Sequence, residues 1–318
     1  MWGLLAFALA GAAAELIDGS LGMGFGVTGS TILVASGFGP AVSSASVHGA
    51  EVFTSLASGT SHLKLGNVDR KLLWALALPG VVGGVLGAFL LSGFDSALAR
   101  PLVAAILLCL GVLIVLRFVK QGTGERPKVP ASRGRIAALG FTAASVDAFG
   151  GGGWGPIATP TLILGSSLEP RRAVGTVNLA EFFVTLAITV TFLATLGPSG
   201  YQWSFVAAVA VGGVLCAPAG AWITARLPAP RLGVVVGVLL VALNARTILQ
   251  SAGLVDASQS LALAALSLGA VGALVVYEFA AAAVERRRAG LKGPPRPAPP
   301  LHRRLDVQAL GQAASWFR

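Results

Sequence analysis

Two short blocks of the sequence combine an aspartate with a run of glycines, and this combination suits the binding of an anion. The blocks are DGSLGMGFG, which begins at Asp18, and DAFGGGGWG, which begins at Asp147. Glycine lets the chain turn tightly, and a helix that starts after such a turn directs its positive dipole end and free amides at it. We therefore predict an oxyanion site formed by the amides of matching glycines: Gly22, Gly24, Gly151 and Gly153.

Both parts of these blocks also have a plainer interpretation. Glycine lets membrane helices pack closely, and an aspartate can cap a helix by accepting backbone N–H bonds. A carboxylate desolvated within a membrane can instead carry a proton. We therefore expect Asp18 and Asp147 either to organise the two half-helices or to take part in proton coupling.

A second pair of matching segments follows the glycine blocks, and each contains a glutamate. SVHGAEVF at 46–53 aligns with TVNLAEFF at 176–183, and the Asp-to-Glu spacing is 33 residues in the first copy and 34 in the second. Acidic groups well inside apolar helices mark a functional interior or a pathway. Glu51 and Glu181 are predicted to serve proton coupling or half-helix organisation, and a structural hydrogen bond between helices is the alternative.

Polar residues precede each glutamate. His48 and Asn178 lie three residues before Glu51 and Glu181, so each pair shares one helix face. His48 joins the predicted proton-coupling set, although a single histidine more often makes a structural hydrogen bond. Three further polar side chains complete the predicted substrate site: Ser46, Thr176 and Asn178.

The composition places these blocks within a membrane. Of 318 residues, 55% are hydrophobic and 11% are charged, whereas soluble proteins carry about 25% charged residues. Regions 1–37 and 136–166 are apolar but interrupted, so each is predicted to form two short half-helices that enter the membrane and return. Apolar segments near the length of a spanning helix lie at 44–61, 72–91, 98–117, 174–197, 203–225, 232–252 and 260–283. The expected fold is all-α and polytopic, with about seven full spans plus two re-entrant segments.

The basic residues indicate sidedness. The net charge is +10, and 21 of the 23 Lys and Arg residues fall on one side of an alternating scheme, in segments 64–71, 117–135, 171–172, 226–231 and 286–318. The positive-inside rule then puts the C-terminus in the cytoplasm and the N-terminus outside a bacterial-type inner (plasma) membrane. Nucleic acid is not an expected partner, because aromatic residues do not alternate with the basic ones.

The charge pattern gives the two copies of the Asp–Glu blocks opposite orientations. Inverted-topology repeats are typical of secondary transporters, with the substrate near the membrane midplane. The expected divisions are a first transmembrane repeat at 1–117, a basic cytoplasmic linker at 118–135, a second, inverted repeat at 136–252, an additional transmembrane helix at 253–284 and a basic Pro-rich cytoplasmic tail at 285–318.

Sequence patterns of common enzymes are missing. The chain contains no Walker A, HExxH or CxxC pattern and no Gly-x-Ser-x-Gly nucleophile elbow. We therefore predict that the protein is not an enzyme and that it has no catalytic residues, no metal and no cofactor.

The chain resembles the TauE/SafE family of sulfite exporters, also called the toluene-sulfonate uptake permease group. The resemblance rests on the first glycine block, on SASVHGAEVFTSLASGTSHLKLGNVDRKL at 44–72, and on DAFGGGGWGPIATPTLILG and RRAVGTVNLAEFF in the second half. It implies a carrier of sulfite, an organosulfonate or a related small anion, coupled to protons. A passive anion channel is the alternative, and a membrane-embedded enzyme or assembly factor is a weaker one. The expected partners are a small sulfur-containing anion, protons and the lipid bilayer, and a homodimer is compatible with this function.

Overall fold

The computed structural model describes residues 2–119, 132–165 and 168–223, together with scattered residues between 238 and 255. These described parts are helical, and no strand occurs among them. The elements are α1 (Trp2–Leu21), α2 (Phe25–Ala35), α3 (Pro40–Lys64), α4 (Arg70–Ser92), α5 (Ser96–Val119), α6 (Arg133–Gly150), α7 (Trp154–Gly165), α8 (Pro170–Leu196), the short 3-10 helix η1 (Pro198–Gly200) and α9 (Trp203–Ile223).

Four of the described helices are long and apolar enough to cross a membrane. They are α1, α4, α8 and α9. The predicted spans at 72–91, 98–117, 174–197 and 203–225 coincide, to within a few residues, with α4, α5, α8 and α9. The predicted span at 44–61 lies inside α3. This helix is long enough to cross a membrane but is less apolar, because it contains many polar side chains, most of which are buried.

Other parts of the predicted organisation cannot be compared with the structure. The segment 260–283 and the tail at 285–318 lie outside the described residues. The linker at 118–135 and the segment 232–252 lie mostly outside them.

Both glycine-rich regions break where the sequence predicts. The breaks separate α1 from α2 and α6 from α7. Gly22 and Gly151 have φ angles of +68° and +69°, and Gly24 has +130°, which are conformations that favour glycine. The helices before the two breaks are longer than the expected short half-helices, since α1 has 20 residues and α6 has 18. The many alanines and leucines of α1 have high helix propensity, which extends this helix to a length that could cross a membrane.

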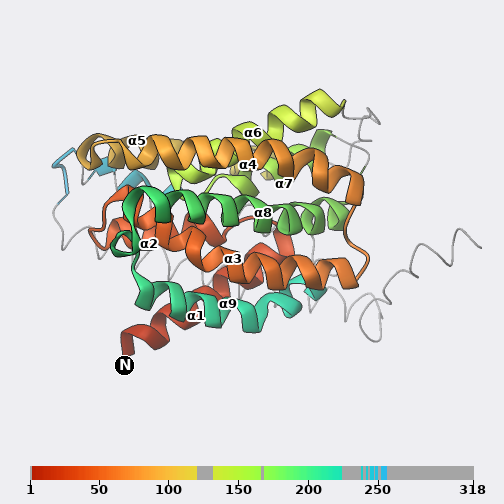
Figure 1. The fold of residues 1–318 in the computed structure, drawn as a ribbon, viewed down its shortest axis with the longest axis horizontal. Coiled ribbons are helices and arrows are strands. Elements are labelled where there is room, and N and C mark those ends of the chain that lie inside the picture. The colour runs from red at the N-terminus through yellow and green to blue at the C-terminus, as the bar shows by residue number, and fades with distance from the viewer. Residues whose placement is uncertain are drawn as a thin grey trace, which may run out of the picture.

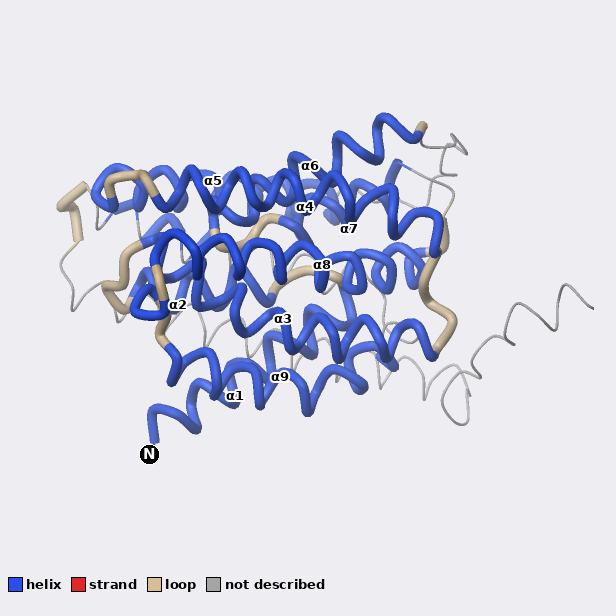
Figure 2. Tube along the Cα trace, in the orientation of Figure 1, coloured by secondary structure: helices blue, strands red, loops and turns tan. Residues whose placement is uncertain are grey.

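Two long helices, α3 and α8, pack against each other in the centre of the bundle (Figure 1). α9 packs beside α3, and α4 packs beside α8. On the outside, α1 packs on α9 and α6 packs on α4, while the short helices α2 and α7 contact α3 and α8. Figure 2 shows loop segments at both ends of the bundle and also in its middle, where helices are interrupted.

The two central helices run in opposite directions. Near the start of α3, the Ser46 hydroxyl accepts a 2.8 Å hydrogen bond from the amide of Gln202, which directly precedes α9. Near the start of α8, the Thr176 hydroxyl accepts a 2.9 Å bond from the amide of Asp69, which directly precedes α4. Because α4 begins one short turn after α3 ends, α8 begins where α3 ends.

Glycines bring the outer helix pairs into backbone contact. A Cβ atom on Gly212 of α9 would overlap the backbone of α1 at Ala8, and one on Gly83 of α4 would overlap the backbone of α6 at Phe141. These two glycines lie outside the two glycine blocks and serve close helix packing.

Candidate functional site

The two breaks lie against each other in the middle of the bundle. A Cβ atom on Gly155, at the start of α7, would lie 2.5 Å from the carbonyl oxygen of Gly22 and 2.6 Å from Cα of Met23. A Cβ atom on Gly26, at the start of α2, would lie 3.2 Å from Cα of Gly152. Each half-helix therefore starts directly over the break of the other, at a distance that leaves little or no room for a side chain.

Two hydroxyl groups form reciprocal hydrogen bonds where the two breaks lie against each other, a region called here the crossing of the breaks. Thr159 of α7 donates a 2.7 Å hydrogen bond to the carbonyl of Gly22 in the first break. Ser30 of α2 donates one to the carbonyl of Gly151 in the second break. Sequence reasoning missed both residues. Extending the alignment of the glycine blocks by four residues would have found them, since each lies 12 residues after its aspartate.

Replacing Thr159 with valine is expected to lower the thermal stability of the protein. Valine keeps the shape of the side chain but removes the hydroxyl, which leaves the buried Gly22 carbonyl without this donor. An unsatisfied buried polar group costs about 1–3 kcal/mol. The melting temperature of the purified protein in detergent measures the effect. Thr159→Ser keeps the donor, so a Ser variant as unstable as the Val variant would contradict the assigned role.

Each aspartate spans its own break and binds the amide at the start of the next helix. Asp18 Oδ1 accepts a 3.3 Å hydrogen bond from the amide of Phe25. Asp147 Oδ1 accepts a 2.7 Å bond from the amide of Gly153. Both carboxylates are buried. They thus occupy the positive ends of α2 and α7, where a carboxylate is favourable.

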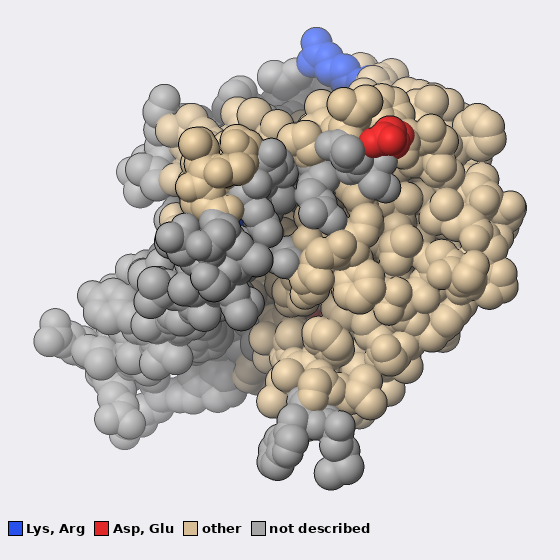
Figure 3. Space-filling view, turned by 90° about the vertical axis from the view of Figure 1, so that its left-hand side faces the viewer, with Lys and Arg blue, Asp and Glu red and all other residues tan. Residues whose placement is uncertain are grey.

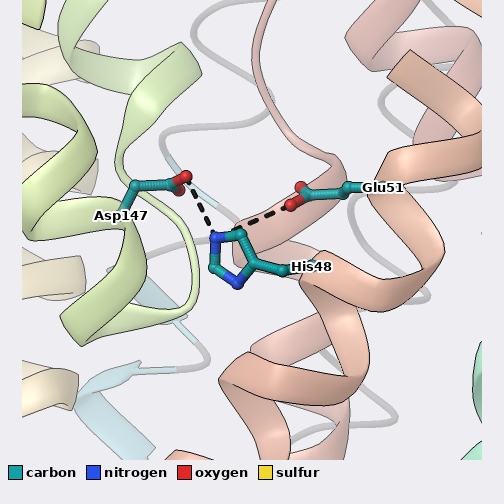
Figure 4. Close-up of side chains that lie close together, drawn as sticks. All are labelled: His48, Glu51 and Asp147. Atoms are coloured by element: carbon teal, nitrogen blue, oxygen red, sulfur yellow. Dashed lines mark hydrogen bonds and ion pairs between the residues drawn. The ribbon is translucent and has the colours of Figure 1, made fainter. Parts of the chain in front are cut away.

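Asp147 also belongs to a cluster with His48 and Glu51 (Figure 4). His48 Nε2 lies 3.1 Å from Asp147 Oδ2 and 3.8 Å from Glu51 Oε2, and all three side chains are buried. The other ring nitrogen, Nδ1, lies 2.7 Å from the carbonyl oxygen of Ser44. A carbonyl only accepts, so Nδ1 carries a hydrogen. The contact between Nε2 and Asp147 therefore needs one proton, held by the ring or by the carboxyl group.

The same three side chains form a set that could hold a metal ion. Each offers one ligand atom, and these atoms lie within 4.8 Å of one another. The sequence predicts no metal because residues 48, 51 and 147 do not follow a metal-binding spacing, and only the fold brings them together. A histidine with two carboxylates suits a divalent transition metal, but the direct hydrogen bond between His48 and Asp147 favours a shared proton.

The counterpart of His48 in the second half makes a matching contact with different chemistry. Asn178 of α8 donates a 3.0 Å hydrogen bond to the Ser58 hydroxyl and a longer one, 3.5 Å, to the carbonyl of Asp18. His48 thus reaches from α3 to the end of α6, and Asn178 reaches from α8 to the end of α1. Unlike the imidazole ring, the Asn178 amide does not titrate.

Glu181 is also buried, on the α8 turn that follows Asn178. It lies close enough to the other buried acids of the core, Asp18, Glu51, Asp147 and Glu15, to interact with them electrostatically. The predicted acidic residues therefore form one connected group around the crossing of the breaks.

The predicted amide donors are already bonded within the protein at three of the four glycines. The amides of Gly22 and Gly151 donate to the carbonyls of Asp18 and Asp147, at 2.5 and 2.6 Å. The amide of Gly153 donates to the Asp147 carboxylate. An anion that binds the Gly153 amide must therefore displace the Asp147 carboxylate.

Two predicted substrate ligands make their hydrogen bonds away from the breaks. The Ser46 hydroxyl donates to the carbonyl of Val42 and accepts from the segment before α9. The Thr176 hydroxyl donates to the carbonyl of Arg172 and accepts from the segment before α4. These hydroxyls connect helix starts at the two ends of the bundle.

A family model described as "Sulfite exporter TauE/SafE" matches residues 7–247. The chain belongs to the TauE/SafE sulfite exporter family. The match includes both breaks and the His48–Glu51–Asp147 cluster, and it confirms the resemblance seen in the sequence. The chain is also 43% identical over 248 residues to a protein of Bacillus subtilis (strain 168) named probable membrane transporter protein YtnM, covering 77% of this chain and 83% of that protein. No solved structure matches the chain. This TauE/SafE protein is thus a membrane transporter.

Proposed function

We propose that this TauE/SafE protein is a secondary transporter that moves a small anion, such as sulfite or an organosulfonate, across the bacterial inner membrane together with protons. One observation carries the proposal. A single buried carboxylate, Asp147, both occupies the amide at the start of α7 and faces a histidine with which it shares a proton.

Coupling between anion and proton follows because the Asp147 carboxylate and the anion compete for the start of α7. A negative carboxylate at the positive end of α7 repels an incoming anion and occupies the Gly153 amide. A proton on Asp147 removes its charge and weakens its hold on the amide, so an anion can take its place. Anion and proton then bind together, and neither binds well alone. The predicted ligands at the other break, Gly22 and Gly24, would face the same anion from the other half.

The proposal includes two inverted repeats, residues 1–117 and 136–252. The antiparallel packing of α3 and α8 supports it, as does the matched packing of α1 on α9 and α6 on α4. The reciprocal bonds of Ser30 and Thr159 relate the two breaks in the same way. Such repeats give a carrier two related arrangements, open to opposite sides of the membrane.

We also propose that the N-terminus lies outside the cell. Figure 3 looks onto the end of the bundle from which α1 starts, and among the described residues it shows mostly uncharged side chains. Basic residues gather at the opposite end, where Arg172 at the start of α8 pairs with Asp69 before α4 at 3.2 Å. The positive-inside rule assigns that opposite end to the cytoplasm.

Flux measurements in proteoliposomes test the function. We expect the purified protein to accumulate ³⁵S-sulfite or a labelled sulfonate against its gradient when an inward proton gradient is imposed. A protonophore should abolish this accumulation, and protein-free liposomes are the control. Flux that is only downhill and independent of the proton gradient would identify a channel. An absence of flux for sulfite, sulfoacetate, taurine and thiosulfate would refute the proposed substrate class.

A further inference from the structure

A second group of buried polar side chains consists of residues that do not belong to the His48–Glu51–Asp147 cluster. Glu15 of α1 is 1% exposed, and the hydroxyls of Ser58 and Thr54 on α3 interact with its carboxyl group. The Ser58 hydroxyl also accepts the 3.0 Å hydrogen bond from Asn178 of α8. Three helices thus direct oxygen-bearing side chains at one buried place. Sequence reasoning missed Glu15, although an acidic residue inside an apolar helix is itself a signal.

Two oxygen atoms of this group have no hydrogen-bond partner within the part of the chain that the structure describes. They are Glu15 Oε1 and Asn178 Oδ1. The Nδ2 atom of the same Asn178 amide is bonded to the Ser58 hydroxyl, which ties this side chain to the group. Gly19 brings the backbone of α1 close to this group, because a Cβ atom placed there would be 3.3 Å from both Glu15 Oε1 and Ser58 Oγ and 3.2 Å from Cα of Gly220. Buried oxygens of this kind normally have a partner.

The charges around this place favour a cation. Glu15 interacts electrostatically with Asp18, one helical turn further along α1, and the negative dipole end of α1 follows at Leu21. The neighbouring His62 supplies no positive charge. Its Nδ1 accepts a 3.2 Å hydrogen bond from the Asn67 amide, so Nε2 carries the single hydrogen and donates it to the carbonyl of Gly19 at 2.8 Å.

The matching place in the second half shows that the fold does not need these polar groups. When α6 is aligned on α1 and α8 on α3, the counterparts of Glu15, Thr54, Ser58 and His62 are apolar and fully buried: Ala144, Val184, Ile188 and Phe192. The same helix packing is thus built there without a polar side chain at any of these positions. Since buried polar groups are costly, their presence in one half indicates a ligand.

We propose that this group is a binding site for one sodium ion. The Glu15 carboxylate, the Ser58 and Thr54 hydroxyls and Asn178 Oδ1 would supply its oxygen ligands. Hard cations prefer such all-oxygen sites, and transporters bind Na⁺ beside the C-terminal ends of broken helices. This inference does not rest on the identity of the transported anion or on proton coupling.

The experiment compares the melting temperature of the purified protein in detergent in NaCl, KCl and choline chloride at equal ionic strength. A saturating ligand that binds only the folded state raises stability, so we expect Na⁺ to raise the melting temperature by about 5 °C at 100 times its dissociation constant. The shift should saturate with Na⁺ concentration and should be absent in K⁺ and choline. Glu15→Gln and Ser58→Ala should both lose it.

Ser55→Ala is the matched control, because Ser55 lies on the same helix and its hydroxyl donates to the carbonyl of Glu51 within α3. This variant should keep the Na⁺ shift. If Glu15→Gln does not fold, the melting temperature of Ser58→Ala in Na⁺ tests the site, since this substitution removes one ligand oxygen and little volume. Equal melting temperatures of the unmodified protein in Na⁺ and K⁺ would refute the site, as would a Na⁺ shift retained in Ser58→Ala. Both results are measured without transport, so they can refute the sodium site whether or not the proposed transport function is correct.

Discussion

Replacing His48 with glutamine is expected to abolish proton-driven accumulation of the anion while downhill exchange continues. The glutamine amide nitrogen takes the approximate place of Nε2 and can still donate to Asp147, but it cannot take up or release a proton. With one coupled proton, a pH difference of one unit supports about a tenfold concentration ratio of a monovalent anion. In proteoliposomes with such a gradient, the accumulation ratio should fall from about ten to about one.

His62→Gln is the matched control for this experiment. Both histidines lie on α3 and both are fully buried. The His62 ring is held neutral by its bonds to Asn67 and Gly19, and glutamine can supply the same donor to the Gly19 carbonyl. This variant should accumulate the anion as the unmodified protein does. Full accumulation by His48→Gln would remove the coupling role of His48, and equal loss in both variants would point to a structural effect.

Replacing Gly155 with alanine is expected to destabilise the whole protein. The added Cβ atom would lie 2.5 and 2.6 Å from backbone atoms of Gly22 and Met23, and backbone in the packed centre cannot move aside as a flexible side chain can. Overpacking a core costs about 1–3 kcal/mol. For a protein of this size that lowers the melting temperature by several degrees, and the fraction of monodisperse protein after purification should fall.

Gly134→Ala is the control for overpacking. Gly134 lies in the first turn of α6, and a Cβ atom there meets no atom within 4 Å. Alanine at this position should leave the melting temperature unchanged or raise it slightly, because glycine is the weaker helix former. A Gly155→Ala protein as stable as the unmodified one would contradict the close crossing of the two breaks.

The sequence predicted the elements of this protein better than their contacts. The all-helical architecture and the positions of both breaks follow from the spacing of apolar residues and glycines, which are local properties of the chain. The length of α1 did not follow, because the glycines and the buried Asp18 suggested an interruption while the alanines before them favoured a continuous helix. The membrane and transporter class followed from composition and from the two matching blocks.

The sequence allowed candidate site residues to be selected, but it did not predict how they are arranged. Asp18, Asp147, Glu51, Glu181, His48 and Asn178 could be selected from the sequence, because polar residues are costly inside apolar helices and each of these lies at a matched position. Ser46 and Thr176 met the same criteria, yet their hydroxyls bond at helix starts near the ends of the bundle. Matching in sequence therefore identified equivalent residues without indicating what they contact.

By itself, the sequence determined which residues are equivalent in the two halves and where each half is broken. Only the tertiary structure decided that each half completes the other: Thr159 bonds to the first break, Ser30 to the second, and His48 of one half faces Asp147 of the other. These contacts join residues about a hundred or more positions apart. Their formation depends on α3 and α8 packing antiparallel, and no local pattern of apolar residues or glycines specifies that packing.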